Sequence, residues 1–532
     1  MHRKLLAVFA VALTTFLLVG AITLLPALAS PRAALVTNGP IVYVDDDTCP
    51  AVGSGTDVDP YCRIQDGVDA VADGGAVLVA AGTYTGTELV VDSRTGYTYT
   101  QVVFITRSVT LRGGYDAGDW SAGSNPAINA TTIDACRAGR GISIVGVDGD
   151  EPAVSLDGLT ITGGDYTGLR NVYDSPFDVG GGIYAYRGGL TVRNCVVSDN
   201  VASRTSDGRG GGIYVERAYG DPGTVVESTV VLSNSALGDT GKGGGLYLLR
   251  SNPISISRTT FQDNTASYCC GGAMLESFYA PLTIVETDFL GNTAGSNGRC
   301  GGYIELRAGA ALSMDRVRFL GNRNEQGEAV LNIQANAPGT AIPPARLTNL
   351  VFADNRADST RAHNALMSIN STGSGNETEF SLAHVTAADN QVPTFVYGSS
   401  AGSNHTLRVS LTNTLMVSLT HGFVGYELSD NGVEIRHTNT LTDNVTTLHH
   451  VEDGSPTFTA VNAMGGHASL DCTYHLRPDS DAIDAGVDAG VTVDIDGDSR
   501  PIYDGYDIGA DEFVVYRVYL PLVNRVALQP ST

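Results

Sequence analysis

The sequence predicts an all-β solenoid in which short strands stack as the successive turns of one long coil. A pair of glycines followed by an apolar strand recurs at intervals of 27 to 33 residues, and a nearly fixed period in this range is typical of repeat architectures. Each copy precedes a second strand that ends in or near asparagine. The 64 glycines and the 17% charged residues suit short strands and tight turns better than long helices. The copies are GGIYAYR (181–187), GGIYVER (211–217), GGLYLLR (244–250), GGAMLES (271–277) and GGYIELR (301–307).

Residues 1–29 are predicted to be a secretory signal peptide. A basic stretch at positions 2–4 precedes a long apolar run, and Ala-Leu-Ala at 27–29 fits a small-residue cleavage site. Because the apolar run is long for a signal peptide, an uncleaved membrane anchor is the alternative. After cleavage no remaining stretch is long and apolar enough to span a bilayer. We therefore expect an extracellular or cell-envelope protein.

The rest of the chain divides into a cap, a repeat region and a C-terminal part. Residues 30–140 are expected to form the N-terminal cap and the first turns, with a short helix in 64–75 that covers the edge of the end strand. Residues 141–420 hold the repeats. The repeated asparagines are expected to adopt left-handed backbone conformations at bends and to hydrogen-bond up and down their column. They are Asn200, Asn234, Asn264, Asn292, Asn322, Asn355 and Asn390.

The repeats resemble those of a known group of bacterial proteins. The glycine motif with FQDN, FLGN and FADN strands is similar to the repeats of polymorphic outer-membrane proteins and related surface proteins. From residue 41 to about 420 the chain resembles the right-handed parallel β-helix of the pectin lyase-like superfamily. The resemblance implies a right-handed parallel β-helix on an exported bacterial protein.

The C-terminal part, residues 421–513, is expected to hold the end of the β-helix and an appended segment, with 421–470 irregular. The appended segment contains AIDAG at 482–486, DIDGDSRP at 494–501 and DIGADE at 507–512. These elements resemble the C-terminal segment of the β-helix surface proteins called choice-of-anchor Q, which implies attachment to the envelope or secretion. Residues 514–532 look like a short terminal tail.

The charge of the chain excludes some partners. The formal net charge is −25, so the basic face that nucleic acid requires is missing. An acidic, solvated surface is typical of a soluble secreted protein, and we expect a monomer. The alternative interpretation of the acidity is recruitment of divalent cations.

The eight cysteines suit an exported protein with disulfides. Cys49 and Cys62 are predicted to close a loop near the N-terminus. Cys270 and Cys300 precede the glycine pairs of successive copies, so stacking at ~4.8 Å would bring them within disulfide reach. Cys269 is an alternative partner in this pair. Spacing assigns no partner to Cys136, Cys195 and Cys472.

One acidic cluster is a candidate metal site. Asp494, Asp496 and Asp498 resemble the first half of a calcium loop, in which hard oxygen ligands converge on Ca²⁺. The loop is not an EF-hand, because Gly505 stands where a bidentate Glu is required. The alternative is a set of solvated Asp-Gly turns. The residues that would have to complete the site are Asp507, Asp511 or Glu512.

Stacking of the copies also creates columns of like residues that are candidates for ligand binding. Tyrosine rings can pack on sugar faces, and an Arg fork binds carboxylate or sulfate. The alternative is structural, with the rings partly in the core and the arginines paired to glutamates. Strand parity does not decide which face points outward. The columns are Tyr184, Tyr214 and Tyr247; Arg187, Arg217 and Arg250; and Glu216 with Glu276.

No catalytic residue can be assigned from the sequence. The resemblance implies lyases with calcium-binding aspartates and an Arg or Lys base, or hydrolases with paired carboxylates. Adjacent aspartates on a repeat strand, Gly-His-Gly and Arg-x-Lys do not occur. We therefore expect a non-catalytic adhesion or glycan-binding module whose partner is a polysaccharide or a cell-surface protein. The alternatives are a carbohydrate-active enzyme, foremost a polysaccharide lyase, and a rigid structural stalk.

Overall fold

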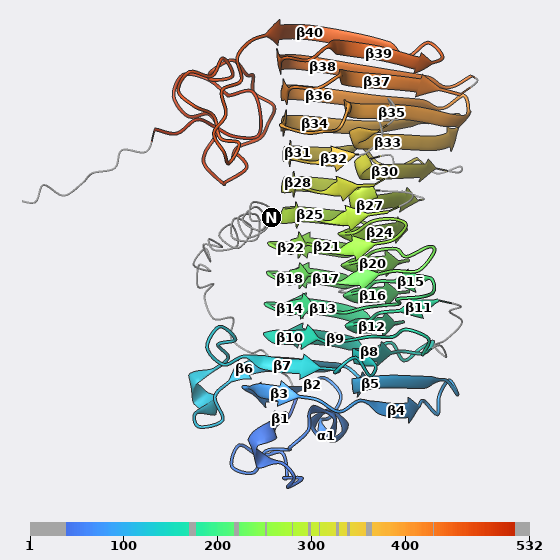
Figure 1. The fold of residues 1–532 in the computed structure, drawn as a ribbon, viewed down its shortest axis with the longest axis vertical. Coiled ribbons are helices and arrows are strands. Elements are labelled where there is room, and N and C mark those ends of the chain that lie inside the picture. Colours follow the sequence, from blue (N-terminus) through green and yellow to red (C-terminus); the bar gives the residue numbers. More distant parts are fainter. Residues whose placement is uncertain are drawn as a thin grey trace, which may run out of the picture. The chain divides into compact units, whose positions relative to one another are not determined.

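The computed structural model describes residues 39–515 apart from short internal gaps, and these residues form a right-handed parallel β-helix (Figure 1). The expected signal peptide and residues 516–532 of the expected tail lie outside the described residues. Within the described part, no helix has the length and apolar character to cross a membrane. The internal gaps are 170–176, 218–222, 251–252, 279, 296–298, 308, 326–328, 338–340, 358–363 and 429.

One long sheet, here called sheet 2, holds the strands that follow the glycine pairs. Its strands are parallel except for the first two, which pair in antiparallel fashion. In order they are β4 (Glu88–Val91), β5 (Thr98–Ile105), β8 (Arg140–Val145), β12 (Ile183–Tyr186), β16 (Ile213–Glu216), β20 (Leu246–Leu249), β24 (Ala273–Phe278), β27 (Arg299–Arg307), β30 (Ala329–Ala337), β33 (Ala365–Ser374), β35 (Thr394–Ser403), β37 (His421–Glu427) and β39 (Thr447–Asp453).

The second long sheet, sheet 1, has 20 strands and holds the segments that lead to the repeated asparagines. They are β1 (Ile41–Val44), β2 (Gly75–Ala80), β3 (Gly82–Tyr84), β6 (Val109–Tyr115), β7 (Thr131–Asp134), β9 (Ala153–Asp157), β10 (Leu159–Thr162), β13 (Gly189–Arg193), β14 (Val196–Ser198), β17 (Thr224–Glu227), β18 (Val230–Leu232), β21 (Ile254–Ser257), β22 (Thr260–Gln262), β25 (Leu282–Leu290), β28 (Leu312–Leu320), β31 (Ala345–Ala353), β34 (Glu377–Ala388), β36 (Thr406–Val417), β38 (Gly432–Asp443) and β40 (Thr457–Gly465).

Two small sheets and three short helical elements complete the solenoid beside the two long sheets. A five-stranded sheet of two-residue strands comprises β19 (Ser235–Ala236), β23 (Thr265–Ala266), β26 (Thr293–Ala294), β29 (Arg323–Asn324) and β32 (Arg356–Ala357). A separate pair comprises β11 (Asp178–Val179) and β15 (Gly208–Arg209). The helical elements are α1 (Ile64–Ala70) and the 3₁₀ turns η1 (Asp46–Thr48) and η2 (Trp120–Ala122).

The expected capping helix is present as α1. It is shorter than the 64–75 segment, because Val71 already has extended backbone angles. Ile64 and Val68 of α1 are buried and join the hydrophobic core together with Val44 and Val77 of the first strands. The helix therefore packs on the first turn, as the sequence predicts.

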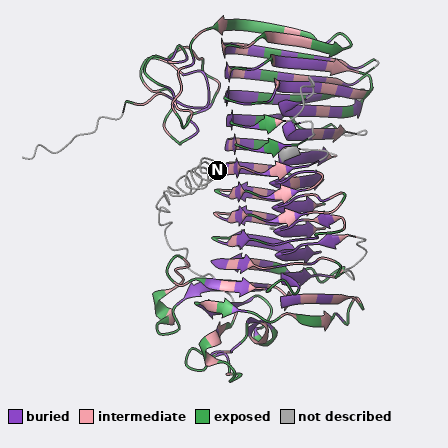
Figure 2. Ribbon diagram, in the orientation of Figure 1, coloured by how far each residue is buried: buried purple, intermediate pink, exposed green. Residues whose placement is uncertain are grey.

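Strand alternation separates an interior from an outer face. In β12, Ile183 and Ala185 belong to the interior core, while Tyr184 and Tyr186 belong to a separate cluster outside it. The interior consists of stacked like residues, and Figure 2 shows it buried through the middle of the solenoid, with the terminal strands β39 and β40 largely exposed or intermediate. The clearest stack is formed by phenylalanines on successive turns, whose ring centroids lie 4.8 to 5.0 Å apart: Phe261, Phe289, Phe319 and Phe352.

The repeated asparagines form a buried hydrogen-bonded ladder, as predicted. The Nδ2 of Asn264 donates to the Oδ1 of Asn292 at 3.0 Å, and the same Oδ1 accepts the backbone N–H of Asn264 at 3.0 Å. This pattern repeats without interruption from Asn200 to Asn390. The expected left-handed conformation is wrong for these residues. It belongs to the residue before each of them, such as Asp263, whose φ is +51°.

The glycine pairs make room for this ladder. A Cβ on Gly212 would lie 2.6 Å from the carbonyl oxygen of Gly245 and 2.9 Å from the side-chain amide of Asn234. Real Cβ atoms do not approach other atoms so closely, so a larger residue would push successive turns apart. The two features that repeat in the sequence, the glycine pair and the asparagine, are therefore two sides of one contact.

The register changes by one residue between β24 and β27, and this overturns one predicted disulfide. Ala273 pairs with Gly302, so Cys300 is level with Gly271 and not with Cys270. The structure joins Cys270 to its neighbour Cys269. The Cys49–Cys62 disulfide is present as predicted. The unpaired cysteines of the described residues are Cys136, Cys195 and Cys472.

The expected irregularity of residues 421–470 is also wrong. Strands β37 to β40 continue both long sheets through this region. Beyond Gly465 the described chain contains neither helix nor strand. This C-terminal segment, residues 466–515, packs against the outer side of sheet 1. Its contacts include a hydrogen bond of 2.7 Å from Asn413 Nδ2 to the carbonyl of Val487 and one of 2.9 Å from the N–H of Ala510 to Thr386 Oγ1.

Candidate functional site

The outer face of sheet 2 carries two columns of side chains that parallel register builds from successive strands. The first column follows the tyrosines of the glycine motif and runs on to Met274 and Tyr303. In the second column Tyr186 lies beside Glu216, and further along Glu276 lies beside Glu305. Neighbouring strands in a sheet are ~4.8 Å apart, so groups in one column are close enough to act together.

The three predicted tyrosines stack on one another but are buried. The ring centroids are 5.8 Å apart for Tyr184 and Tyr214 and 5.5 Å apart for Tyr214 and Tyr247. Their residues are 1%, 2% and 3% exposed. This contradicts the interpretation in which the rings face solvent and stack on a sugar. The structural alternative describes them correctly.

Arginines from neighbouring segments cover this stack. The Arg140 guanidinium lies between two rings, 3.3 Å from the centroid of Tyr166 and 4.4 Å from that of Tyr184. Arg140 is fully buried and donates hydrogen bonds to the carbonyl of Val179. A buried cation over aromatic faces is stabilised by the ring quadrupoles. The tyrosine column is thus a second core outside the solenoid.

The predicted arginine column lies at the strand ends, where the chain turns. Arg187 and Arg217 have φ values of +52° and +59°, and both donate to the Tyr186 hydroxyl, at 3.2 Å and 3.0 Å. Arg250 shares the left-handed conformation and is exposed. The structure therefore brings these arginines to the rim of the outer face.

The predicted glutamates lie apart from each other. Glu216 accepts a hydrogen bond of 2.8 Å from the Tyr214 hydroxyl and lies 3.7 Å from Arg217 Nε. Its partner on the next strand is Leu249, not Glu276. The grouping of Glu216 with Glu276 in one column is correct, but a hydrophobic residue separates the two carboxylates.

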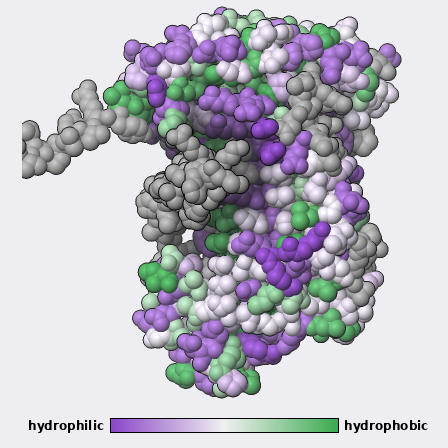
Figure 3. Space-filling model, in the orientation of Figure 1, coloured by the Kyte–Doolittle hydropathy of each residue, from purple (hydrophilic) through white to green (hydrophobic). Residues whose placement is uncertain are grey.

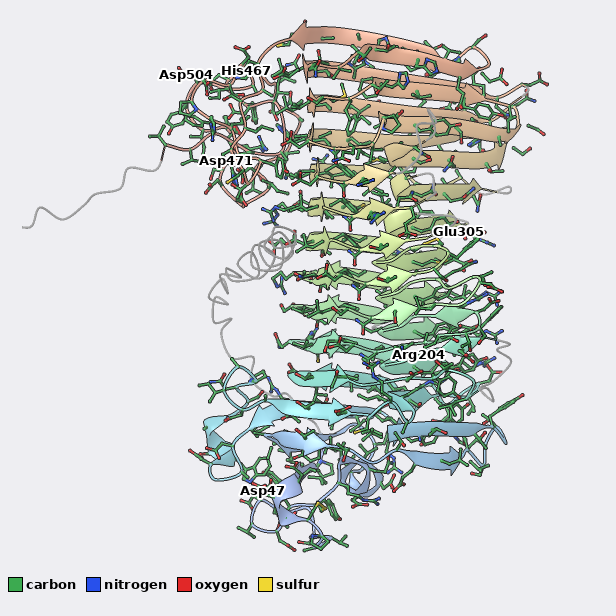
Figure 4. All side chains as sticks on the ribbon, in the orientation of Figure 1. Asp47, Arg204, Glu305, His467, Asp471 and Asp504 are labelled. Atoms are coloured by element: carbon green, nitrogen blue, oxygen red, sulfur yellow. A yellow bond between two sulfur atoms is a disulfide. The ribbon has the colours of Figure 1, made fainter. Side chains whose placement is uncertain are left out.

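A closer group surrounds Glu276. Arg307 Nε lies 3.4 Å from Glu276 Oε1, and Arg307 also contacts Glu305, with Nη2 2.6 Å from Oε1. Asn336 Nδ2 donates to the same Glu305 oxygen at 2.8 Å. Glu276 and Glu305 are 6% and 8% exposed. Figure 4 labels Glu305 on the outer side of sheet 2. We call Glu216, Glu276, Glu305, Arg217 and Arg307 the glutamate site.

Burial and neighbouring charges act on the Glu276 carboxyl. Burial raises the pKa of Glu276, and the negative charge of Glu305 raises it further, although Arg307 opposes the shift. Glu305 accepts hydrogen bonds from Arg307 and Asn336. Two adjacent carboxyl groups, one of them with a raised pKa, are an arrangement that can donate and accept protons.

The sequence analysis did not identify Glu305 as a member of this site, nor Tyr303 and Asn336 as its neighbours, although the glycine motif places Arg307 in the arginine column. Alignment on the glycine pairs places Ile304 in the tyrosine column, whereas the observed register places Tyr303 there. The signal that could have found them is the alternation in YIELR, which sets Tyr303 and Glu305 on one side of the strand.

The predicted calcium ligands do different things in the structure. Asp494 accepts backbone N–H groups at 2.8 to 3.1 Å from Asp498, Asp496 and Glu512, so its oxygens hold the loop together. The Asp496 carboxylate turns instead to His475, at 2.6 Å. Calcium binding by the three aspartates stays a prediction, and the loop closure by Asp494 favours the turn interpretation for that residue.

One group of three polar side chains is hydrogen-bonded like a hydrolytic triad, but it is buried and a substrate cannot reach it. Ser371 Oγ lies 2.6 Å from His405 Nε2, and His405 Nδ1 lies 2.6 Å from Asn376 Oδ1. Ser371 is 2% exposed and His405 is fully buried. Burial lowers the pKa of His405. The group satisfies buried polar atoms at a corner of the solenoid and offers no nucleophile to a substrate.

The visible surface is polar and mixed. Hydrophilic side chains spread over the face in Figure 3, with hydrophobic ones scattered among them. A cavity of about 130 Å³ lies at the N-terminal cap between Arg63, Tyr84 and Glu88. It is remote in sequence from the glutamate site and shares none of its residues.

Comparison with known proteins gives similarities of fold. No protein-family model and no curated protein matches the chain. Among solved structures it is similar to the pectate lyase Pel9A, with 12% identity and a TM-score of 0.39 over 89% of this chain and 96% of that chain. It is also similar to the catalytic unit of a thermostable GH87 α-1,3-glucanase from Streptomyces thermodiastaticus, with 16% identity and a TM-score of 0.44 over 85% of this chain and 73% of that chain. The pairing of parallel strands in the two long sheets itself makes the chain a parallel β-helix protein.

Proposed function

We propose that this β-helix is an exported protein that binds a neutral polysaccharide on the outer face of sheet 2, at the glutamate site. The observation that carries the proposal is the pairing of Glu276 and Glu305 on adjacent strands, together with Arg307 at their side. Carboxylates and guanidinium groups at strand spacing can hydrogen-bond the hydroxyls of successive sugar units. The signal-like N-terminus supports export.

The charges of the site favour a neutral sugar over a uronate. Each arginine of the site already faces a carboxylate or a phenol: Arg307 contacts Glu276 and Glu305, and Arg217 contacts Glu216 and Tyr186. A uronate carboxylate would have to compete with these partners. The net charge of −25 adds a general repulsion of anionic chains.

Affinity electrophoresis in gels that contain one polysaccharide each tests this proposal. Retardation by a neutral glucan, xylan or mannan is expected, and it should disappear in the double variant Glu276→Gln/Glu305→Gln. Glu434→Gln is the matched control, because Glu434 is an exposed ion-pair partner of Arg408 away from the site. Equal retardation of the double variant would contradict the site. Retardation by uronates alone would contradict the neutral class, and no retardation would favour a stalk or a protein-binding role.

Glycoside hydrolysis is a second candidate, favoured by the raised pKa of Glu276. Retaining hydrolases place a carboxylic acid and a carboxylate about 5 to 5.5 Å apart, which is close to the ~4.8 Å between adjacent strands. In this assignment Glu276 is the acid and Glu305 is the nucleophile. A lyase is less well supported, because a guanidinium beside carboxylates stays protonated and is a poor base.

Reducing-end release from the polysaccharide that is retained in the gel distinguishes binding from hydrolysis. If the pair is catalytic, Glu276→Gln should lower the rate by about 10²- to 10⁴-fold, the usual contribution of a general acid. Glu434→Gln should leave the rate unchanged. Binding without any release of reducing ends would remove this candidate and leave the binding proposal intact.

A further inference from the structure

The C-terminal segment, residues 466–515, brings together three side chains that can hold a metal ion. The ligand atoms of His475, Asp496 and Asp511 all lie within 4.8 Å of one another. His475 Nε2 is 2.6 Å from Asp496 Oδ2. We propose that these three residues bind a divalent transition-metal ion of the zinc class, and that this ion clips the C-terminal segment into its folded form.

The histidine is oriented for this task. Its Nδ1 lies 2.8 Å from Thr473 Oγ1, and that hydroxyl donates to Asp471 Oδ1 at 2.8 Å. Metal-binding histidines are commonly fixed in this way through the ring nitrogen that does not bind the metal. This contact leaves Nε2 as the ring nitrogen that faces Asp496 and Asp511.

Asp511 supplies an independent observation that points to a cation. The residue is 7% exposed, and its Oδ2 accepts the N–H of Leu476 at 2.7 Å. Among the described residues, no group donates a hydrogen bond to its Oδ1. A buried carboxylate with one oxygen left without a donor, beside a histidine, is compensated when a metal ion binds.

The donor set selects the class of metal. One imidazole nitrogen and two carboxylate oxygens match Zn²⁺, which binds such ligands at about 2.0 to 2.2 Å and leaves a fourth position for water. Calcium requires six to eight oxygen ligands, which three side chains including a histidine do not provide. In addition, Arg318 donates to Asp496 Oδ1, so the other oxygen, Oδ2, is the one directed to the site.

The ion would connect parts of a segment that has no regular structure to hold it. The described residues 466–515 contain neither helix nor strand. The three ligands come from separate loops of this segment, at positions 475, 496 and 511. Small irregular segments commonly rely on a metal or a disulfide, and Cys472 is unpaired and exposed. The clip would also reach the solenoid, because Arg318 lies on β28 and Tyr474 donates to Asp354 after β31.

This site differs from the predicted calcium loop and from the glutamate site. It takes Asp496 from the three predicted calcium ligands and Asp511 from the residues expected to complete that loop, whereas Asp494 is occupied by backbone N–H groups. It shares no residue with the outer face of sheet 2. Its failure would therefore leave the proposed polysaccharide binding untouched.

Metal titration of the full secreted chain, stripped with a chelator, tests the proposal. Calorimetry with Zn²⁺ should give one site per chain, Co²⁺ should give the visible absorption of a four-coordinate ion, and Zn²⁺ should raise the unfolding midpoint. His475→Ala and Asp511→Asn should each weaken Zn²⁺ binding by at least about 100-fold, since even an outer-shell partner is worth about 10- to 100-fold. Asp511→Asn keeps the acceptor for Leu476, and circular dichroism checks that both variants fold.

Two control variants make the result specific. His467→Ala removes an exposed histidine of the same segment that contacts Asp443, and Cys472→Ser removes the nearby thiol. Both should bind Zn²⁺ like the parent. The proposal is overturned if Zn²⁺ does not bind, if only Ca²⁺ binds, if both ligand variants bind normally, or if Cys472→Ser abolishes binding.

Discussion

Glu276 and Glu305 lie beside each other on β24 and β27, and both carboxylates contact the guanidinium of Arg307. Two buried acids thus share one cation. Burial and then the negative charge of Glu305 raise the pKa of Glu276, and the single positive charge of Arg307 opposes this shift without cancelling it.

The first prediction concerns the pH dependence that this pair gives to stability. Because the pKa of Glu276 is higher in the folded than in the unfolded chain, the folded state binds the proton more tightly. Stability therefore falls as the pH rises from the ordinary range of a glutamate through the raised pKa. Glu276→Gln should have a higher denaturation midpoint than the parent at pH 8, and this advantage should vanish at pH 4.

Urea denaturation at the two pH values provides the measurement. Glu434→Gln, which removes an exposed carboxylate paired with Arg408, should shift the midpoint little at either pH. If Glu276→Gln destabilised the chain more at pH 8 than at pH 4, the ion pair with Arg307 would outweigh burial and the assignment of the acid would be wrong.

The second prediction tests the buried tyrosine column. Tyr214→Ala should lower the free energy of unfolding by about 3 to 5 kcal/mol, as for other large aromatic residues in a core, because Tyr214 is 2% exposed and stacked on both sides. Tyr214→Phe removes only the hydrogen bond to Glu216 and should cost about 1 kcal/mol. Chemical denaturation measures both.

Leu89→Ala is the control for this series. Leu89 lies on β4 and is 69% exposed, so its removal should change the free energy by less than about 0.5 kcal/mol. A small effect of Tyr214→Ala, combined with a loss of polysaccharide binding, would restore the interpretation of the column as a sugar-stacking surface.

The third prediction concerns the asparagine ladder. Asn264→Ala removes the Oδ1 that accepts the backbone N–H and the Nδ2 of Asn234. It also removes the Nδ2 that donates to Asn292 Oδ1 and to the carbonyl of Val231. Each unsatisfied buried group costs about 1 to 3 kcal/mol, so a loss of about 3 kcal/mol or more is expected in denaturant unfolding. Gln262→Ala on the same turn breaks only an exposed contact with Asp263 and should be nearly neutral. Equal effects of the two variants would show that the ladder does not stabilise the solenoid.

The fourth prediction is a loss of stability in mild acid at the C-terminal end of the solenoid. His437 Nε2 lies 2.8 Å from His449 Nε2, and burial, aided by His449, lowers the pKa of His437 to about 4 from an ordinary 6.5. The unfolded chain therefore binds more protons between these values, so stability is complete above about pH 6.5 and falls as the pH drops toward 4.

Hydrogen exchange of β38 and β39 at pH 7 and pH 5, corrected for intrinsic rates, measures this loss. His437→Gln should flatten the difference between the two pH values. The exposed His467, replaced by Gln, serves as the control and should leave the difference as it is. If protection in these strands were the same at both pH values in the parent, the histidine pair would have no role in acid sensitivity.

The fold could be predicted from the sequence because a solenoid repeats its local rules. The glycine pair and the asparagine meet in one contact, as at Gly212 and Asn234, so both must recur wherever the turn recurs. The short helix at Ile64 could be predicted for a similar reason, since an end strand needs a cover. Strands β37 to β40 were missed because they lack the glycine pair and keep only the alternation of the strand.

The candidate site was predicted only in part, because the repeated motif does not determine the register in which adjacent strands pair. A one-residue shift moves Tyr303 and Glu305 into the outer columns and removes Cys300 from the side of Cys270. The sequence also does not show whether a tyrosine that points away from the interior is exposed to solvent. Tyr184 points away from the interior, but the guanidinium of Arg140 covers its ring. Burial of this kind depends on segments that cross the sheet from elsewhere in the chain.

The asparagine ladder also gives the molecule an electrical direction. Every side-chain amide points the same way, from the Oδ1 of Asn200, which accepts the N–H of Gly164, to the Nδ2 of Asn390, which donates to the carbonyl of Phe352. Aligned amide dipoles polarise one another and strengthen the chain that they form. An amide turned over in the middle would meet its neighbours oxygen to oxygen and nitrogen to nitrogen, so each turn passes its orientation to the next. The column therefore behaves as a single polarised filament, negative toward the first turns and positive toward the last.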